Sequence, residues 1–204
     1  MKPIETIMRT APVIPVLVIE DVAHAVPVAR ALVAGGLRVL EVTLRTPAAL
    51  DAIRAMRGVE GAIVGAGTVT NPDDLKASID AGAEFIVSPG LTMRLGEAAV
   101  ASGIPFLPGT ANAADIMTGL DLGLAHFKFF PAATSGGLPA LKALAGPFHQ
   151  VKFCPTGGIN LATATDWLAF DPVLCVGGSW LVPKGAPDEE AIAAAARAAC
   201  ALRT

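Results

Sequence analysis

Short apolar runs alternate with longer amphipathic stretches along the chain, with a period of about 20–25 residues. The short runs are rich in β-branched residues and end in Gly, Pro, Thr or Ser, which predicts buried strands. We place these strands at residues 13–19, 38–44, 62–67, 85–90, 105–110, 126–130, 151–155 and 173–178. The Ala- and Leu-rich stretches between them predict helices at about 22–34, 48–57, 72–81, 92–102, 112–122, 137–145, 161–169 and 188–202. Several helix boundaries are supported by residues typical of helix starts: Asn71-Pro72, Thr92, Asn112 and Asp188.

Strict alternation of strand and helix implies an α/β fold with a parallel sheet covered by helices. Eight strand–helix pairs, with polar turn residues after each strand, favour closure into a (β/α)8 TIM barrel. We expect a single domain over residues 1–204, with a short helix in Met1–Arg9 ahead of the barrel. A doubly wound open sheet is the alternative, but it usually has fewer strands and a GxGxxG-type first turn, which this chain lacks.

Two of the predicted strands carry charged residues on one face. In the run RVLEVTLRT, Glu41, Thr43 and Arg45 share one face, and apolar residues share the other. Because the apolar face should pack on helices, we expect the polar face to point into the barrel. The same rule turns Lys128 and Phe130 inward in the run HFKFFP. These are the second and sixth strands, so Glu41 and Lys128 should approach each other from opposite walls of a narrow barrel.

A buried lysine opposite a glutamate has two interpretations. It can be half of a structural ion pair, since buried charges are commonly paired. Alternatively, an uncharged lysine amine can attack a ketone to form a Schiff base, with the carboxylate as acid/base. Arg45 and Thr43 on the same face as Glu41 favour the second interpretation, because four polar groups exceed what one internal salt bridge needs.

Gly-Gly pairs follow the seventh and eighth predicted strands, where barrels commonly bind phosphate. In the runs FCPTGGIN and CVGGSWL, these pairs allow backbone N–H groups to approach an anion, and Ser179 can add a hydroxyl donor. One Gly-Gly pair is more often an ordinary turn. Two pairs at these two strand ends indicate a phosphate site.

The composition narrows the class of protein and its partners. Hydrophobic residues make up 53% of the 204 residues and the mean hydropathy is +0.58, but no stretch of ~18 purely apolar residues predicts a membrane span. A formal net charge of −3 and a pI near 5.6, without a basic cluster, argue against binding to nucleic acid or anionic membranes. Three cysteines without a CxxC motif suit a reducing cytoplasm. Three scattered histidines make a preformed metal site unexpected, and the proposed amine chemistry requires no cofactor.

Six segments together resemble the class I aldolases for 2-keto-3-deoxy-6-phosphogluconate (KDPG) and 4-hydroxy-2-oxoglutarate (KHG): EVTLRT, GAGTV, SPG, FKFFPA, FCPTGGI and GGSWLVP. They occur in order at matching spacing from about Pro12 to Pro183. The resemblance implies reversible cleavage of KDPG to pyruvate and glyceraldehyde 3-phosphate, and also of 4-hydroxy-2-oxoglutarate to pyruvate and glyoxylate. It further implies a metal-independent, cytoplasmic homotrimer of the Entner–Doudoroff pathway, with a phosphorylated keto acid as its substrate.

The resemblance also implies roles for individual residues. Lys128 would carry the Schiff base, and Glu41 would be the acid/base. Arg45 would hold the substrate carboxylate, which its planar fork of N–H donors suits. The pyruvate end would be lined by Thr68, Pro89, Phe130 and Thr156. The phosphate would be received by Gly157, Gly158, Gly178 and Ser179.

Other functions stay open at this stage. A phosphosugar isomerase, or a transferase similar to thiamin-phosphate synthase, would share the Gly-Gly phosphate site without requiring Lys128 as a nucleophile. A non-catalytic phosphoester-binding barrel would use Lys128 only as a structural charge. Within the aldolase interpretation, the galactonate-derived epimer of the substrate differs only in one hydroxyl configuration, and the motif match favours the gluconate form.

Overall fold

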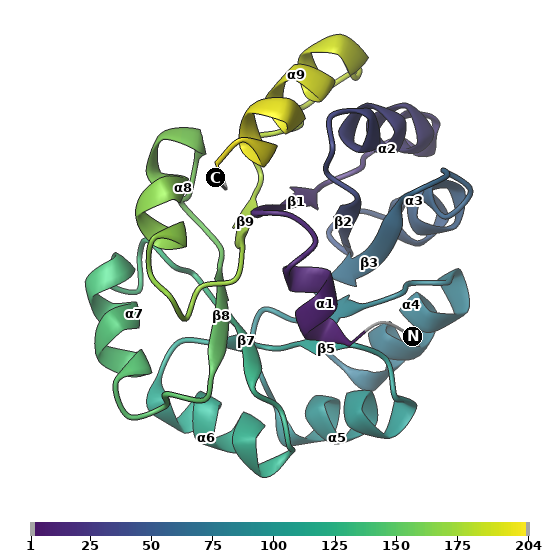
Figure 1. Cartoon of the computed structure of the whole chain (residues 1–204). Helices are drawn as coiled ribbons and strands as arrows, with labels where there is room; N and C mark the ends of the chain where they lie inside the picture. Colours follow the sequence, from purple (N-terminus) through teal and green to yellow (C-terminus); the bar gives the residue numbers. More distant parts are fainter. Residues whose placement is uncertain (1–2, 203–204) are drawn as a thin grey trace.

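Helices and parallel strands alternate along the computed structural model, which describes residues 3–202 (Figure 1). The strands are β1 (Val13–Leu17), β2 (Val39–Thr43), β3 (Ile63–Gly67), β4 (Ile86–Val87), β5 (Phe106–Leu107), β6 (Gly109–Thr110), β7 (His126–Phe129), β8 (Lys152–Pro155) and β9 (Val176–Gly178). The helices are α1 (Ile4–Met8), the 3₁₀-helix η1 (Val22–His24), α2 (Ala25–Ala34), α3 (Ala49–Met56), α4 (Pro72–Ala81), α5 (Met93–Ser102), α6 (Ala113–Asp121), α7 (Gly137–Ala145), α8 (Leu161–Leu168) and α9 (Glu189–Cys200). Each predicted strand and helix overlaps an observed element, and α1 is the short helix expected ahead of the first strand.

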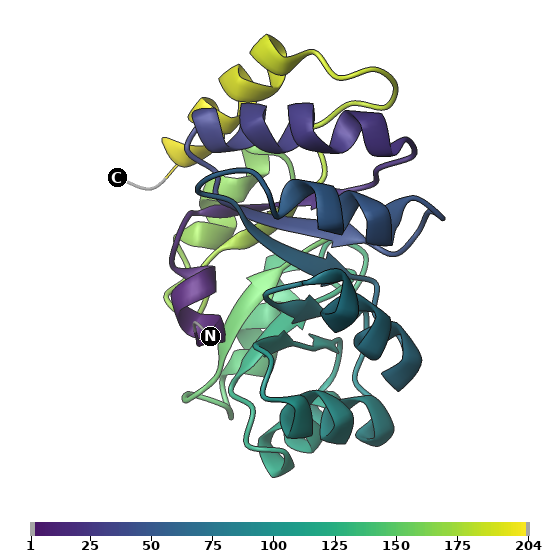
Figure 2. The same ribbon diagram turned by 90° about the vertical axis from the view of Figure 1, so that its right-hand side faces the viewer.

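The strands form two parallel sheets that curl around a common axis. One sheet has the order β5-β4-β3-β2-β1-β9, and the other has the order β6-β7-β8. Isolated parallel bridges join Phe153 to Val173 and Thr156 to Gly177, between β8 and the segment that includes β9. Figures 1 and 2 show helices α2 to α9 on the outside of this half-barrel, whereas α1 lies across one end of it. The predicted α/β fold with parallel strands is therefore confirmed, and closure into an eight-stranded barrel stays a prediction.

The strand predicted at residues 105–110 is divided into β5 and β6 at Pro108. Proline has no N–H, so the ladder loses one donor at this position. The carbonyl of Pro108 still accepts a hydrogen bond from the backbone N–H of Lys128 at 2.8 Å. This bond joins the segment to β7 at the position of the buried lysine.

Side-chain caps determine where the loops enter several helices. Four predicted cap residues accept backbone N–H groups from the first turn of their helix: Asn71, Thr92, Asn112 and Asp188. A cap that the sequence analysis did not single out is Asn160, which forms a capping box with Thr163 at the start of α8. The helix predicted from residue 22 begins as the 3₁₀ turn η1, capped by Asp21, before it continues as α2.

Hydrophobic side chains pack on both faces of the curled sheets. The layer between strands and helices includes Phe127 and Phe129, which point outward from β7 as predicted. A second layer lies inside the curl and includes Ile7 and Met8 of α1, which are 1% and 0% exposed. Because α1 packs into this inner layer, it covers the end of the curl from which β1 starts (Figure 1).

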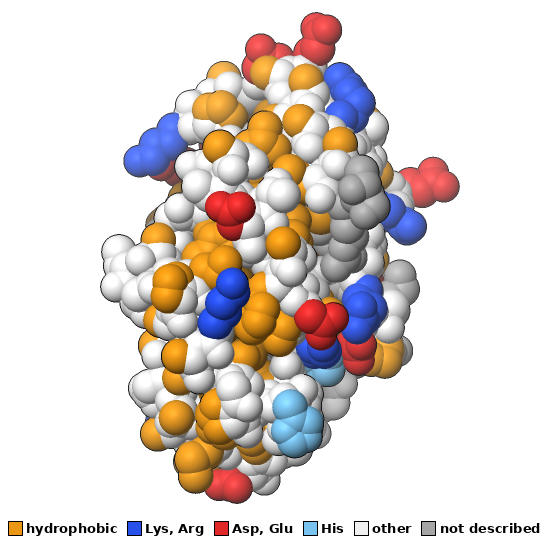
Figure 3. All heavy atoms as spheres, turned by 60° about the vertical axis from the view of Figure 1, so that its left-hand side comes forward, with side chains coloured by type: hydrophobic (Ala, Val, Ile, Leu, Met, Phe, Trp, Pro, Cys, Tyr) orange, Lys and Arg blue, Asp and Glu red, His pale blue; other side chains and the backbone are white. Residues whose placement is uncertain are grey.

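The surface combines scattered charges with hydrophobic side chains. On the face in Figure 3, hydrophobic side chains lie in patches between single charged residues, and several Lys or Arg and Asp or Glu side chains gather at the lower right. Large exposed hydrophobic residues include Met117 on α6, at 58%, and Met93 on α5, at 47%. Within residues 3–202, every helix is too short or too polar to span a membrane.

Candidate active site

Lys128 and Glu41 meet inside the curled sheets. Lys128 lies on β7 and is 6% exposed, and Glu41 lies on β2 and is 3% exposed. The Nζ of Lys128 donates a hydrogen bond to Oε1 of Glu41 at 3.2 Å. The two strands therefore face each other as the alternation of side chains predicts. The contact is an ion pair when both groups are charged, and Lys128 lines a cavity at this point.

Gly67 provides the space that the Glu41 carboxylate occupies. A Cβ atom added to Gly67 would lie 2.2 Å from Oε1 of Glu41 and 2.7 Å from its Cγ. Gly67 pairs in register with Thr43 in the β2–β3 ladder, and Gly65 pairs with Glu41. Gly67 thus leaves room for the acidic side chain on β2, whereas Gly65 leaves room for the ring of Phe85, which would lie 2.4 Å from an added Cβ.

Phe130 lies beside the amine of Lys128. The Nζ lies 5.1 Å from the centre of the Phe130 ring, within the range of a cation–π contact. The ring also packs close to Gly157, where an added Cβ would lie 3.5 Å from it. The aromatic ring therefore forms an apolar wall between the lysine and the first Gly-Gly loop.

Arg45 follows β2, and a hydrogen bond to Thr43 holds its side chain. Its Nε donates a hydrogen bond to Oγ1 of Thr43 at 3.2 Å, and this hydroxyl in turn donates to the carbonyl of Leu17 at 2.8 Å. Thr46, on the other side of Arg45, donates to the carbonyl of Ile19 at 2.5 Å. The segment that carries Arg45 is therefore attached to β1 and its extension at two points.

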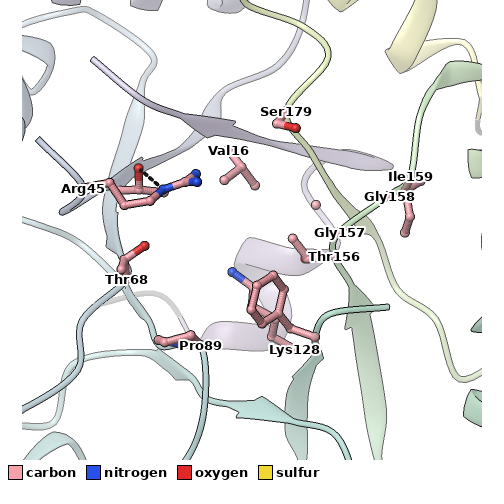
Figure 4. Close-up of a pocket in the computed structure, with 13 residues that line it drawn as sticks. Val16, Arg45, Thr68, Pro89, Lys128, Thr156, Gly157, Gly158, Ile159 and Ser179 are labelled. Atoms are coloured by element: carbon pink, nitrogen blue, oxygen red, sulfur yellow. Dashed lines mark hydrogen bonds between the residues drawn. The ribbon is translucent and has the colours of Figure 1, made fainter. Parts of the chain in front are cut away.

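A cavity of about 260 Å³ opens beside Lys128. Figure 4 shows Arg45 and Thr68 on one side of it and Gly157 and Gly158 on the other, with the lysine amine between them. Nine of the predicted site residues line it: Arg45, Thr68, Pro89, Lys128, Phe130, Thr156, Gly157, Gly158 and Ser179. Thr43, which the sequence analysis placed on the same inward face as Glu41 and Arg45, lines it too. The other two predicted residues, Glu41 and Gly178, do not line it: Glu41 is hydrogen-bonded to the lining residue Lys128, and Gly177 lines the cavity in place of its neighbour Gly178.

The sequence analysis did not select three of the lining residues: Val16, Ile159 and Gly177. Val16 could have been found from the alternation of side chains along β1, because Ile14 belongs to the inner hydrophobic layer. Gly177 belongs to the predicted Gly-Gly pair, but sequence alone does not say which of the two glycines faces inward. An added Cβ on Gly177 would lie 2.2 Å from Oγ1 of Thr156, so this glycine leaves space for the threonine.

Backbone conformations at the cavity are unusual in three places. Thr68 has a φ of +60°, which is rare for a β-branched residue. Gly157 and Gly158 have φ values of +103° and +74°, and these values require glycine. Strained or left-handed residues that line a cavity are typical of sites where backbone groups must be aimed at a ligand.

The charges around the cavity are distributed unevenly. Among the described lining residues, the cations are Lys128 and Arg45, whereas the Gly157–Gly158 loop and Ser179 offer N–H and hydroxyl donors. An elongated ligand with an anionic group at each end would therefore meet a guanidinium at one end and neutral donors at the other. Between these ends, a buried amine and a carboxylate can carry out carbonyl chemistry on the ligand.

Other titratable groups lie at the opposite end of the curl, near α1. The Nε2 of His126 lies 3.4 Å from a carboxylate oxygen of Glu5. Burial lowers the pKa of His126, although Glu5 acts in the opposite direction. A hydrogen bond from Arg9 lowers the pKa of Glu5. In the part of the chain that the structure describes, no group of three or more His, Cys, Asp or Glu residues is arranged to hold a metal ion.

Known proteins resemble this chain over its whole length. The family model for KDPG and KHG aldolase matches residues 4–197. The 2-dehydro-3-deoxy-phosphogluconate aldolase of Zymomonas mobilis is 61% identical over 203 residues, which cover 100% of this chain and 98% of the relative. The crystal structure of the 2-keto-3-deoxy-6-phosphogluconate aldolase of Z. mobilis ZM4 with 3-phosphoglycerate has a TM-score of 0.97 at 61% identity, and the match covers 98% of this chain and 96% of that one. KDPG aldolase from Legionella pneumophila, with pyruvate captured at low pH as a covalent carbinolamine intermediate, has a TM-score of 0.94 at 45% identity, with 98% of each chain covered.

Proposed function

The chain belongs to the KDPG and KHG aldolase family, and from this premise we propose that it cleaves KDPG reversibly to pyruvate and glyceraldehyde 3-phosphate. It is a carbon–carbon lyase of the class I type. The name of the Z. mobilis relative, which matches over the full chain, supports this substrate. We propose 4-hydroxy-2-oxoglutarate as a second substrate, because the family description includes it.

The observation that carries the proposal is the buried amine of Lys128, 3.2 Å from the Glu41 carboxylate at the wall of a cavity of about 260 Å³. The amine adds to the C2 carbonyl of the keto acid, and loss of water gives an iminium. The iminium accepts the electron pair of the C3–C4 bond as that bond breaks and the C4 hydroxyl loses its proton. The resulting enamine takes up a proton at C3, and hydrolysis releases pyruvate and the free lysine. The carbinolamine captured in the L. pneumophila relative supports amine attack on pyruvate.

Glu41 is the proposed acid/base for these proton transfers. Its carboxylate lies within hydrogen-bond distance of the reacting amine, which is the geometric requirement for proton transfer. In the cleavage direction it accepts the proton of the C4 hydroxyl, directly or through one water. In the reverse direction it returns that proton to the new hydroxyl.

Arg45 and four neighbours form the proposed pyruvate end. The guanidinium of Arg45 lies across the cavity from the Gly-Gly loop and suits a carboxylate (Figure 4). The other proposed contacts are Thr68, Pro89, Phe130 and Thr156, all of which line the same cavity.

The proposed phosphate end is formed by Gly157, Gly158 and Ser179, together with Gly178, which does not line the cavity itself but lies between the lining residues Gly177 and Ser179. The positive φ of the first two residues and the exposed hydroxyl of Ser179 support an anion held by neutral donors. The Z. mobilis structure with 3-phosphoglycerate supports binding of a phosphorylated acid in this family. Gly177 also lines this part of the cavity and belongs with the set.

Reductive trapping tests the proposal directly. Borohydride added with pyruvate should attach a reduced pyruvyl group to Lys128, and peptide mass spectrometry should locate it. Lys128→Arg keeps the charge but lacks the nucleophilic amine, so it should lose both labelling and cleavage of KDPG. Labelling at another residue, or substantial cleavage by Lys128→Arg, would reject the Schiff-base function. Relative kcat/KM for KDPG, its galactonate epimer and 4-hydroxy-2-oxoglutarate then ranks the substrates.

We also propose a closed barrel, a cytoplasmic location and a trimeric assembly. The two sheets form one closed (β/α)8 barrel, supported by the bridges between β8 and the β9 segment. The protein is a cytoplasmic homotrimer, for which the family membership and exposed hydrophobic residues such as Met117 are the support. Sedimentation equilibrium tests the trimer, and a monomeric mass would reject it.

A further inference from the structure

The hydroxyl of Thr43 connects Arg45 to the framework of the sheet. Thr43 is 1% exposed and lies at the end of β2. Its Oγ1 accepts a hydrogen bond from Nε of Arg45 at 3.2 Å and donates one to the carbonyl of Leu17 at 2.8 Å. Since the single hydroxyl proton is directed at Leu17, a lone pair of Oγ1 is left for Arg45. The carbonyl of Leu17 on β1 therefore fixes the orientation of the hydroxyl, and the hydroxyl in turn fixes the position of the Arg45 Nε.

This contact limits the positions that the guanidinium can take. Arg45 is exposed and, in the described part of the chain, no carboxylate forms an ion pair with it. An arginine side chain without such partners samples many rotamers, and binding a ligand then requires that freedom to be lost. With Nε engaged by Thr43, the two terminal nitrogens remain available, and they can bind a carboxylate end-on with two parallel hydrogen bonds.

We infer that Thr43 is a positioning residue that preorganises Arg45 for the carboxylate of the keto acid. The inference rests on the proposed role of Arg45. Thr43 itself lines the cavity, but its hydroxyl already has both a donor and an acceptor partner within the protein, so it acts through the arginine. Figure 4 shows the dashed contact to Arg45 at the wall of the cavity that holds the lysine amine.

Thr43→Val tests the inference, because valine keeps the shape of threonine and removes the hydroxyl. The concentration of pyruvate that gives half-maximal borohydride labelling of Lys128 should rise about tenfold, as expected when one rotamer-rich side chain must be immobilised on binding. Labelling with acetone, which has a ketone but no carboxylate, should keep its wild-type concentration dependence. Thr43→Ser retains the hydroxyl and should restore the pyruvate dependence to within about twofold of wild type.

Two variants separate positioning from structural damage. Thr118→Val removes a threonine hydroxyl that donates to the carbonyl of Ala114 on α6, outside the segment that carries Arg45, so its pyruvate dependence should stay near wild type. Thr110→Val removes a buried threonine hydroxyl that has no hydrogen-bond partner among residues 3–202, so the concentration dependence of labelling should stay unchanged for both pyruvate and acetone. If Thr43→Val does not fold, the same labelling measurements are made on Thr43→Ala. Equal weakening for pyruvate and acetone, or no weakening for pyruvate, would overturn the inference.

Arg45→Ala distinguishes this inference from the proposed function. If the proposed role of Arg45 is correct, Arg45→Ala weakens pyruvate labelling and spares acetone, and adding Thr43→Val to it has no further effect. If Arg45→Ala leaves pyruvate labelling unchanged, the carboxylate role of Arg45 is wrong. If Arg45→Ala weakens it and Thr43→Val alone does not, only the inference about Thr43 is wrong.

Discussion

Replacing Gly67 by alanine should move the Glu41 carboxylate while every functional group of the site stays in the chain. The added Cβ would lie 2.2 Å from Oε1, 2.7 Å from Cγ and 2.8 Å from Cδ of Glu41. Gly67 is not among the residues with a positive φ, so alanine fits the backbone at this position. The clash is therefore with the acidic side chain itself.

The magnitude follows from the geometry. Real Cβ atoms stay at least 3.0 Å from such neighbours, so Oε1 must move by about 0.8 Å or more. A displacement of that size lengthens the 3.2 Å contact with Lys128 if it points away from the amine. Misplacing a catalytic group by ~1 Å can lower a rate about 10²-fold. We therefore expect kcat/KM for KDPG to fall about 100-fold, which corresponds to about 2.7 kcal/mol in transition-state free energy. Overpacking should lower the free energy of unfolding by roughly 1–3 kcal/mol.

The assay follows pyruvate release from KDPG with a coupled lactate dehydrogenase reaction. Borohydride labelling of Lys128 by saturating pyruvate should still go to completion in Gly67→Ala, because the amine is intact. Gly58→Ala is the matched control, since its added Cβ would meet nothing closer than a carbonyl oxygen at 3.6 Å. In Glu41→Ala/Gly67→Ala the clashing atoms are gone, so the double variant should be as active and as stable as Glu41→Ala alone.

Two results would refute the reasoning. One is a Gly67→Ala enzyme that keeps kcat/KM within about threefold of wild type, because the carboxylate position would then be unimportant for turnover. The other is a double variant that is much slower than Glu41→Ala, because the alanine would then act on something other than Glu41.

Three further predictions concern the acid/base, metals and pH. Glu41→Gln should still be labelled by pyruvate and borohydride but lose about 10²–10⁴-fold in kcat; unchanged turnover would remove Glu41 from the mechanism. EDTA should leave KDPG cleavage intact, since the reaction proceeds through the Lys128 amine, and complete inactivation that Mg²⁺ or Zn²⁺ reverses would contradict this. Burial lowers the pKa of His126 from 6.5, so the unfolded chain binds more protons than the folded one as pH falls through this range, and stability is lost toward acid. His126→Gln should therefore show a smaller decrease in unfolding free energy from pH 7.5 to 5.5 than wild type, measured by urea denaturation, and equal decreases would disprove the assignment.

The inward orientation of Glu41 and Lys128 is predictable because two physical regularities act together. Side chains alternate along a strand, and strands two and six of eight stand opposite each other. The first regularity depends only on neighbouring residues and the second only on the order of the strands, so both can be read from the sequence. The same reasoning identifies Phe127 and Phe129 as outward, and both belong to the layer under the helices.

Other features depend on distances between strands, which the sequence does not encode locally. Gly67 matters because of how close β3 lies to Glu41, and Gly177 matters because of Thr156 on the neighbouring chain segment. The positive φ of Thr68 is similarly hidden, since threonine ordinarily avoids this conformation. Local propensity carries no signal when the surrounding fold imposes the conformation.

The two glycines that make room for acidic and hydroxyl side chains have a consequence for attempts to broaden substrate range. At Gly67 and Gly177 there is nothing left to truncate, because the residues already have the smallest possible side chain and their neighbours fill the space. Laboratory evolution toward bulkier keto acids should therefore select shorter side chains at Val16 or Ile159, which still have atoms to remove at the cavity wall. Any replacement at either glycine is expected to be eliminated from such libraries.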